Sequence, residues 1–282
     1  MKSIMVALDG SPASRTGLQE AARWAALLGA SLRGVFVEDE QRFVHYPAGF
    51  TAEGGVPISA PLPDSELAAE NEKVRVEGEA LHANFDAALK THGIQGQFLQ
   101  ERGEVNAILT REARAAELVV IGCRGRNDPA ETSDPGPTTE TLIHNSLRPV
   151  LVVPEHSKGN GSVVFAHDGS RGAQRVLAPG TQLAFSNSAK VSVIAIGGDA
   201  ELNAVLEESL KRYWEPYGIE PDVRFTPRKG KISAMIVDHA RRQEAGMIVM
   251  GAFGHNPLHE LFFGSTTLET LAQASCPVLL MA

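Results

Sequence analysis

The chain alternates short apolar runs with longer segments in which apolar residues recur every three or four positions. The runs at 3–8, 117–121 and 247–250 have strand length and are almost continuously apolar, which is typical of strands buried on both faces of a sheet. The segment 13–28 has the period of an amphipathic helix. Strands that alternate with helices predict an α/β fold with open parallel sheets and helices on both faces.

The same pattern continues through the whole chain and predicts five strands and four helices in each half. A proline at the first position of the strand 149–153 favours an edge position, because proline cannot donate to a strand ladder. The predicted strands are 3–8, 31–37, 97–100, 117–121, 149–153, 163–167, 190–196, 222–226, 247–250 and 277–281, and the predicted helices are 13–28, 65–92, 104–115, 139–147, 172–185, 200–217, 231–243 and 265–274.

An internal repeat accounts for this doubling. The segment 3–37 lines up without a gap on 162–196 at an offset of 159, which places Asp9 on Asp168, whereas Gly122 falls on Gly251 at an offset of 129. The first half therefore holds 30 additional residues. We predict two domains, 1–155 and 161–282, with most of the insertion at about 39–64. That Gly- and Pro-rich segment is expected to be disordered or a lid, and it could host a small apolar ligand.

The most informative stretch is 247–267. An apolar strand leads into Gly251 and Gly254, nine residues follow, and Gly264 and Ser265 open a new helix. Glycines permit a close backbone approach to a ligand, and the free N–H groups at the start of a helix favour an anion. A phosphate group would suit this position.

The spacing Gly-x2-Gly-x9-Gly-Ser resembles the ATP-binding signature of the universal stress protein family, whose nucleotide-binding members also carry an Asp after the first strand. The resemblance implies five-stranded domains of the adenine nucleotide alpha hydrolase-like, or Rossmann-like, type. Mg²⁺ would then accompany the phosphates of ATP rather than bind protein ligands. By the same resemblance, the adenine would contact Asp168 and the backbone near Ile196, the ribose Gly251, and the phosphates Gly254, Gly264, Ser265 and Thr266, with His255 lining the phosphate loop.

The first half departs from this signature. Ten residues separate Gly125 from Gly136, and Pro137 replaces the serine, which removes both a hydroxyl and an amide donor. Asp128, Glu131 and Asp134 also occupy the loop where phosphates would come. We therefore expect nucleotide binding in the first half to be weak or lost, and Asp9 not to contact a ligand.

Composition bears on the partners and location of the protein and on its cysteines and metal binding. A formal net charge of −8 disfavours broad attraction to nucleic acid or acidic membranes. No signal peptide or membrane-spanning run is evident, so a cytoplasmic location is expected. Cys123 and Cys276 lie far apart and are predicted to be reduced, buried residues. His255, His259 and Glu260 lack the HExxH order, so no metal site is predicted.

Three functions remain open at this stage. The first is a stress-response module that binds ATP in its second domain, with little or no hydrolysis and no assigned catalytic residue. The second is an interaction protein that binds no nucleotide and serves unknown protein partners as a built-in pseudo-dimer, since relatives often pair through their fifth strands. The third is an enzyme that transfers AMP or cleaves ATP, which would require a catalytic Lys, a His pair or a pyrophosphatase loop after the first strand, where the chain has only DGSRGAQ. A homodimer of tandem chains is compatible with the resemblance.

Overall fold

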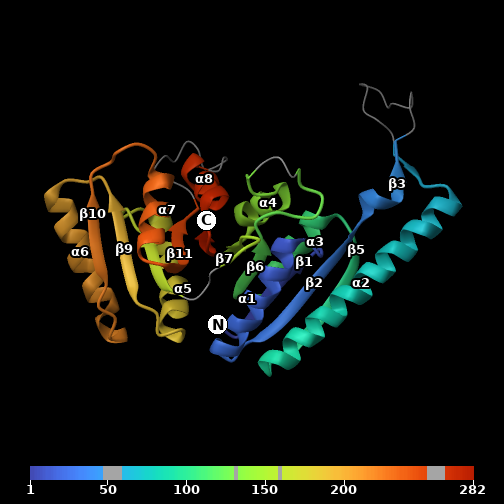
Figure 1. The fold of residues 1–282 in the computed structure, drawn as a ribbon, viewed down its shortest axis with the longest axis horizontal. Coiled ribbons are helices and arrows are strands. Elements are labelled where there is room, and N and C mark those ends of the chain that lie inside the picture. Colours follow the sequence, from blue (N-terminus) through green and yellow to red (C-terminus); the bar gives the residue numbers. More distant parts are fainter. Residues whose placement is uncertain (47–58, 130–132, 158–160, 253–263) are drawn as a thin grey trace.

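The computed structural model describes residues 1–46, 59–129, 133–157, 161–252 and 264–282, and it places one ten-stranded sheet through the whole molecule (Figure 1). Across the described ranges, no helix combines the length and the apolar character needed to cross a membrane. The strands are β1 (Ser3–Leu8), β2 (Ser31–Asp39), β3 (Val44–His45), β4 (Ala60–Pro61), β5 (Gly96–Gly103), β6 (Leu118–Gly122), β7 (Val150–Val153), β8 (Ser162–Ala166), β9 (Val191–Ile196), β10 (Asp222–Thr226), β11 (Ala245–Gly251) and β12 (Val278–Met281). The helices are α1 (Pro12–Leu28), α2 (Asp64–His92), α3 (Val105–Ala113), α4 (Pro137–Asn145), α5 (Arg171–Ser186), α6 (Ala200–Trp214), α7 (Ile232–Arg242) and α8 (Ser265–Gln273), with short 3₁₀ helices η1 (Glu40–Phe43) and η2 (Glu215–Tyr217).

The strand order is β10-β9-β8-β11-β12-β7-β6-β1-β2-β5. Each half contributes five parallel strands, as the sequence predicts. The two half-sheets do not remain separate, however, because β12 and β7 pair antiparallel and place Leu279 opposite Leu151. We call this β7–β12 contact the seam.

The predicted edge position for the strand after Pro149 is wrong. β7 lies in the interior of the sheet, between β6 and β12. Pro149 immediately precedes the strand, and its carbonyl oxygen accepts a hydrogen bond of 3.0 Å from the backbone N–H of Val119. The proline therefore contributes only an acceptor to the sheet, and its missing N–H does not interrupt the ladder.

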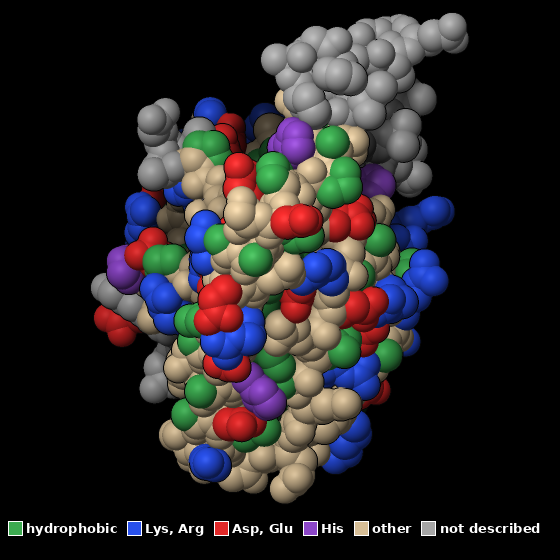
Figure 2. All heavy atoms as spheres, turned by 90° about the vertical axis from the view of Figure 1, so that its right-hand side faces the viewer, with side chains coloured by type: hydrophobic (Ala, Val, Ile, Leu, Met, Phe, Trp, Pro, Cys, Tyr) green, Lys and Arg blue, Asp and Glu red, His purple; other side chains and the backbone are tan. Residues whose placement is uncertain are grey.

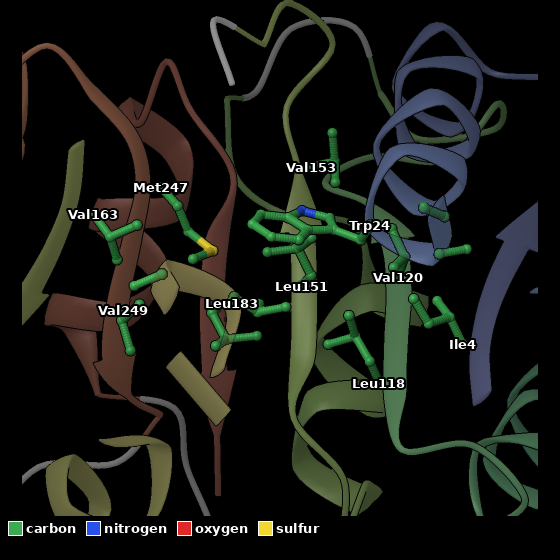
Figure 3. Packing of buried hydrophobic residues seen from close by; sticks show 14 of the residues in the cluster. Ile4, Trp24, Leu118, Val120, Leu151, Val153, Val163, Leu183, Met247 and Val249 are labelled. Atoms are coloured by element: carbon green, nitrogen blue, oxygen red, sulfur yellow. The ribbon is translucent and has the colours of Figure 1, made fainter. Parts of the chain in front are cut away.

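Helices cover both faces of the sheet, and each core layer continues across the seam. α1, α2, α5 and α6 contribute to one layer, and α3, α4, α7 and α8 to the other. Trp24 of α1 lies against β7 beside Leu151 and Val153. Leu183, its counterpart in the repeat, lies in the same core layer, beside β7 and toward the second half (Figure 3). The hydrophobic cores of the two halves are therefore not independent of each other.

Serine caps begin the first helix of each half, at the serine that follows Asp-Gly. The hydroxyl oxygen of Ser11 accepts from the N–H of Ser14 at 3.0 Å, and that of Ser170 accepts from Ala173 at 3.2 Å. Helix α2 differs, since it begins directly after Pro63 with no side-chain cap.

The insertion lies partly outside the described residues, so the lid or disorder expected for its middle, 47–58, is not addressed. Its described ends are ordered. β2 runs on to Asp39, η1 follows, and β3 pairs with β4 as a short antiparallel ribbon. Phe43 of η1 packs with Phe36, Val74 and Leu81 in a small core of its own, which fixes the start of the insertion against α2.

Charged side chains of both signs cover the side of the molecule where α2 and the edge strand β5 lie (Figure 2). Arg75 pairs with Glu72 on α2, and Arg102 at the end of β5 pairs with Glu38 of β2. Charged residues along an edge strand oppose pairing with a further strand. This edge is therefore poorly suited to extending the sheet.

The seam gives a first testable prediction. Leu151→Ala and Leu279→Ala should each lower the free energy of unfolding by about 2–5 kcal/mol, because both leucines are fully buried. Leu147→Ala is the matched control, since that side chain is 82% exposed and should change stability by at most about 0.5 kcal/mol. Urea unfolding followed by the fluorescence of Trp24 and of Trp214, in variants that retain one tryptophan each, should show both halves losing stability together. Separate transitions, with each leucine affecting one half only, would contradict a shared core.

Candidate functional site

A cavity of about 370 Å³ opens at the carboxyl ends of the strands in the first half. It lies between β1 and β6, where the strand order reverses, the position at which open α/β sheets bind ligands. Its apolar wall comes from the ends of β1, β2 and β6 and from α3, and its polar wall from η1, α2, the loop 122–128 and the start of α4. The apolar lining residues are Ala7, Leu8, Val35, Phe36, Val37, Val105, Leu109 and Ile121.

Asp9 joins the end of β1 to the loop that follows β6. One carboxylate oxygen accepts from the N–H of Ser11 at 2.9 Å, and the other accepts from the N–H of Arg126 at 2.8 Å. The carboxylate therefore fixes the loop over the cavity by charge-assisted hydrogen bonds. Asp9 also lines the cavity. The expectation that it does not contact a ligand stays a prediction.

Glu77 of α2 is the centre of a second group of contacts. Its carboxylate pairs with Arg42 of the insertion at 2.7 Å and with Arg126 of the loop at 2.6 Å, and Arg42 also pairs with Glu70. Burial alone would raise the pKa of Glu77, but the hydrogen bond from Arg42 and the charges of Arg126 and Arg42 outweigh it and lower the pKa. Glu77 thus ties the insertion, α2 and the loop into one wall.

Glu77→Gln should therefore lower stability at neutral pH, by roughly 1–3 kcal/mol as for charged hydrogen bonds. Because the folded pKa is depressed, this stabilisation is present above the unfolded pKa of about 4.3 and is lost as the pH falls through the folded value. Urea unfolding at pH 7 and at pH 3 measures the difference. Glu79→Gln on the same helix is the control, since its pair with Arg75 is exposed and should contribute at most about 1 kcal/mol. Equal losses from both variants would contradict the role given to Glu77.

In the second half the structure brings several predicted site residues to the matching edge of the sheet. Asp168 follows β8, Ile196 ends β9 and Gly251 ends β11, and these strands are neighbours. Asp168 accepts from the N–H of Ser170 at 3.0 Å. A Cβ at Gly251 would lie 2.7 Å from the carbonyl carbon of Gly172, so this glycine lets α5 pack closely on β11. Sequence analysis gave Gly251 a ligand role only and missed this packing role.

The remaining predicted residues lie at the start of α8 or outside the described residues. Gly254 and His255 belong to 253–263, which the structure does not describe. Gly264 is the N-cap residue of α8, and because it is a glycine it offers no side-chain cap. Ser265 is the first residue of the helix and is exposed, and the next residue, Thr266, is half-buried. Thr267, which was not predicted, donates from its hydroxyl to the carbonyl oxygen of Ala252 at 2.7 Å and fixes the helix against the end of β11.

A buried histidine lies directly before Asp168 and was missed by sequence analysis. His167 is 2% exposed, its Nδ1 accepts from the N–H of Gly169 at 3.2 Å, and its Nε2 has no hydrogen-bond partner. Burial lowers its pKa, although the charge of Asp168 partly opposes this. The repeat contains the signal that could have revealed it, because the offset of 159 places His167 on Leu8.

His167→Leu should stabilise the protein, because it removes a buried donor whose unmet hydrogen bond costs about 1–3 kcal/mol. The gain should grow as the pH falls below about 6.5, since the unfolded wild-type chain then binds a proton that the folded chain, with its lowered pKa, binds less readily. Unfolding in urea at pH 8 and pH 5 compares the two proteins. Leu8→His tests the reverse exchange and should destabilise. A His167→Leu variant less stable than wild type at both pH values would contradict this account.

Both cysteines are free and buried. Burial raises the pKa of Cys123 to about 11 and that of Cys276 to about 12, so neither thiol ionises near neutral pH. Within the described ranges, no group of three or more His, Cys, Asp or Glu side chains could hold a metal ion. His259 and Glu260 lie outside those ranges.

Comparison with known proteins identifies the family. The model described as the universal stress protein family matches residues 1–154 and again residues 159–281. The chain belongs to the universal stress protein family. Both halves are therefore universal stress protein repeats, which confirms the resemblance inferred from the sequence.

Similar proteins share the tandem length. A universal stress protein of Synechocystis is 26% identical over 99% of both chains, and one from Mycolicibacterium smegmatis is 25% identical over 99% of this chain and 96% of its own. A universal stress protein structure from Archaeoglobus fulgidus superimposes with a TM-score of 0.74 at 17% identity, covering 99% of this chain and 97% of that one. The last comparison concerns the fold alone.

Proposed function

We propose that this tandem universal stress protein binds ATP in its second half and acts as a nucleotide-dependent regulatory module with little or no hydrolysis. The nucleotide would lie across the carboxyl ends of β8, β9 and β11. Asp168 and the backbone at Ile196 would face the adenine, Gly251 the ribose, and the start of α8 the phosphates. Mg²⁺ would accompany the phosphates. Gly254 and His255 belong to the proposed phosphate loop through their place in the sequence.

The observation that carries the proposal is the start of α8. The helix has no side-chain cap, and its first residue is exposed at the same sheet edge as Asp168 and Gly251. Uncapped N–H groups and the helix dipole together favour an anion, by about 0.3–1 kcal/mol for the dipole alone. The Ser265 and Thr266 hydroxyls add donors of the kind that phosphate oxygens accept. The complete Gly-x2-Gly-x9-Gly-Ser spacing belongs to this half alone.

Little hydrolysis is expected from the chemistry of the described residues around this edge. Asp168 already accepts from the backbone of Ser170, and the buried His167 is oriented by Gly169 rather than paired with a carboxylate as a general base would be. We therefore propose ligand-dependent stability or shape as the signal.

Ser265→Glu tests the site with little risk to the fold. Ser265 is exposed, and an acidic residue in the first turn of a helix is stabilising, but its carboxylate would repel phosphates. Isothermal titration of nucleotide-free protein with ATP and Mg²⁺ should show about one ATP per wild-type chain and at least tenfold weaker binding to the variant. Ser265→Gln, of the same size without the charge, is the matched control and should retain most of the affinity. Absence of ATP binding to wild type would refute the proposal and favour the interaction-protein alternative.

A further inference from the structure

The cavity of the first half differs chemically from a phosphate-binding site, because one of its own carboxylates occupies the anion position. Asp128 accepts from the backbone N–H of Gly125 at 2.6 Å. Its carboxylate also lies against Gly136, the N-cap residue of α4, so closely that a Cβ at Gly136 would overlap it. Asp128 thus fills the space between the second motif glycine and the start of the helix.

The start of α4 is also a poor place for a second anion. Pro137 is the first residue of the helix and has no N–H. The corresponding residue of the second half is Ser265. Pro257 stands three residues after Gly254, where Asp128 stands three residues after Gly125, so the sequence of the second half offers no such carboxylate.

The three arginines that line the cavity offset its negative charge only in part. Arg42 pairs with Glu70 and Glu77, and Arg126 pairs with Glu77. Arg124 donates to the carbonyl oxygen of Pro129. The lining holds four carboxylates, Asp9, Asp39, Glu77 and Asp128, against these three guanidinium groups. The polar wall therefore favours a ligand that donates hydrogen bonds over one that brings negative charge.

The opposite wall is apolar and the cavity has the size of a small-molecule site. Val35 and Phe36 of β2 and Ile121 near the end of β6 are buried residues that border the space. A volume of about 370 Å³ falls within the range of about 300–1,000 Å³ that small-molecule sites occupy. An apolar wall that faces carboxylate acceptors suits a ring compound with hydroxyl or amino groups.

We propose that the first half binds an uncharged, donor-bearing ring compound of nucleoside size, and that Asp128 excludes its phosphorylated forms by occupying the anion position. The two halves would then differ in ligand class, with a nucleotide in the second half and an unphosphorylated compound in the first. This inference does not depend on ATP binding in the second half, because the cavity of the first half is built from its own strands.

Adenosine and AMP are suitable probes, since they differ only by the phosphate. The full chain is titrated with adenosine and with AMP, and the binding that remains in Val105→Trp, whose side chain would fill the first cavity, is assigned to the second half and subtracted. We expect adenosine to bind with at least tenfold higher affinity than AMP. Asp128→Asn keeps the shape and an acceptor for Gly125 but removes the charge, and it should reduce this preference at least tenfold. Asp128→Ala, which also empties the space, should reduce it further.

Two further variants locate the binding and check the fold. Val105→Trp fills the cavity from its half-buried rim and should abolish the adenosine binding of the first half, whereas Glu79→Gln removes a charge from an exposed position of α2 outside the cavity and should leave the preference unchanged. Melting temperatures confirm that each variant folds. Failure of adenosine to bind, equal binding of AMP, or an unchanged preference in the Asp128 variants would overturn the inference. ATP binding that Ser265→Glu abolishes concerns the second half alone, so the two proposals can fail separately.

Discussion

The antiparallel seam between β7 and β12 is the contact on which the rest of the molecule depends. Without it, each half would leave a hydrophobic strand unpaired at the edge of its sheet, which invites association with other chains. With it, the pairing is intramolecular, and the core layers on both faces run from one half into the other. Leu151, Leu279 and Trp24 therefore belong to a core that both halves share.

The strand order within each half determines where ligands can bind. The two strand-order reversals lie at β1/β6 and β8/β11, one on each side of the seam. Each reversal has its own strand ends, its own glycine loop and its own following helix. The duplicated chain therefore holds two separate candidate sites on a shared scaffold, and their side chains can differ without altering the scaffold.

The insertion creates the main difference between the halves. It extends β2, adds η1 and leads into the 29-residue helix α2, so that Arg42 and Glu77 reach the rim of the first cavity. Glu77 then pairs with the loop after β6 through Arg126. In the second half the corresponding helix α6 has 15 residues, and the loop after β9 leads into it directly. One segment of sequence thus reshapes a site that the repeat would otherwise duplicate.

Periodicity and the repeat were sufficient to predict the ten strands of the large sheet and the eight described α-helices, because these depend on local pattern, but they did not predict η1, β3, β4 or η2. The pairing of β7 with β12 could not be predicted from Pro149, since the propensity of a single residue does not show which strand lies next to its own. The site was only partly predictable. Asp9, Asp168 and the motif glycines come from spacing, but the Glu77 pairs join segments dozens of residues apart. The repeat marks His167 as a departure from Leu8 without showing that its buried ring lacks a hydrogen-bond partner.

Asp128 shows how a degenerate motif can remain a defined structure. In an intact site, the N–H groups of the glycine loop and of the helix start need an external anion, which binds only at sufficient concentration. A tethered carboxylate acts at an effective concentration that is typically millimolar or higher, so it satisfies the Gly125 N–H at all times. A ligand phosphate would have to displace it and also bear the repulsion of Asp9 and Asp39 in a partly buried space, where charges interact more strongly than in water. Asp128, which takes the place of a ligand phosphate, thus keeps the loop in place over the cavity. The loop of the first half is therefore held in position whether or not a ligand is bound.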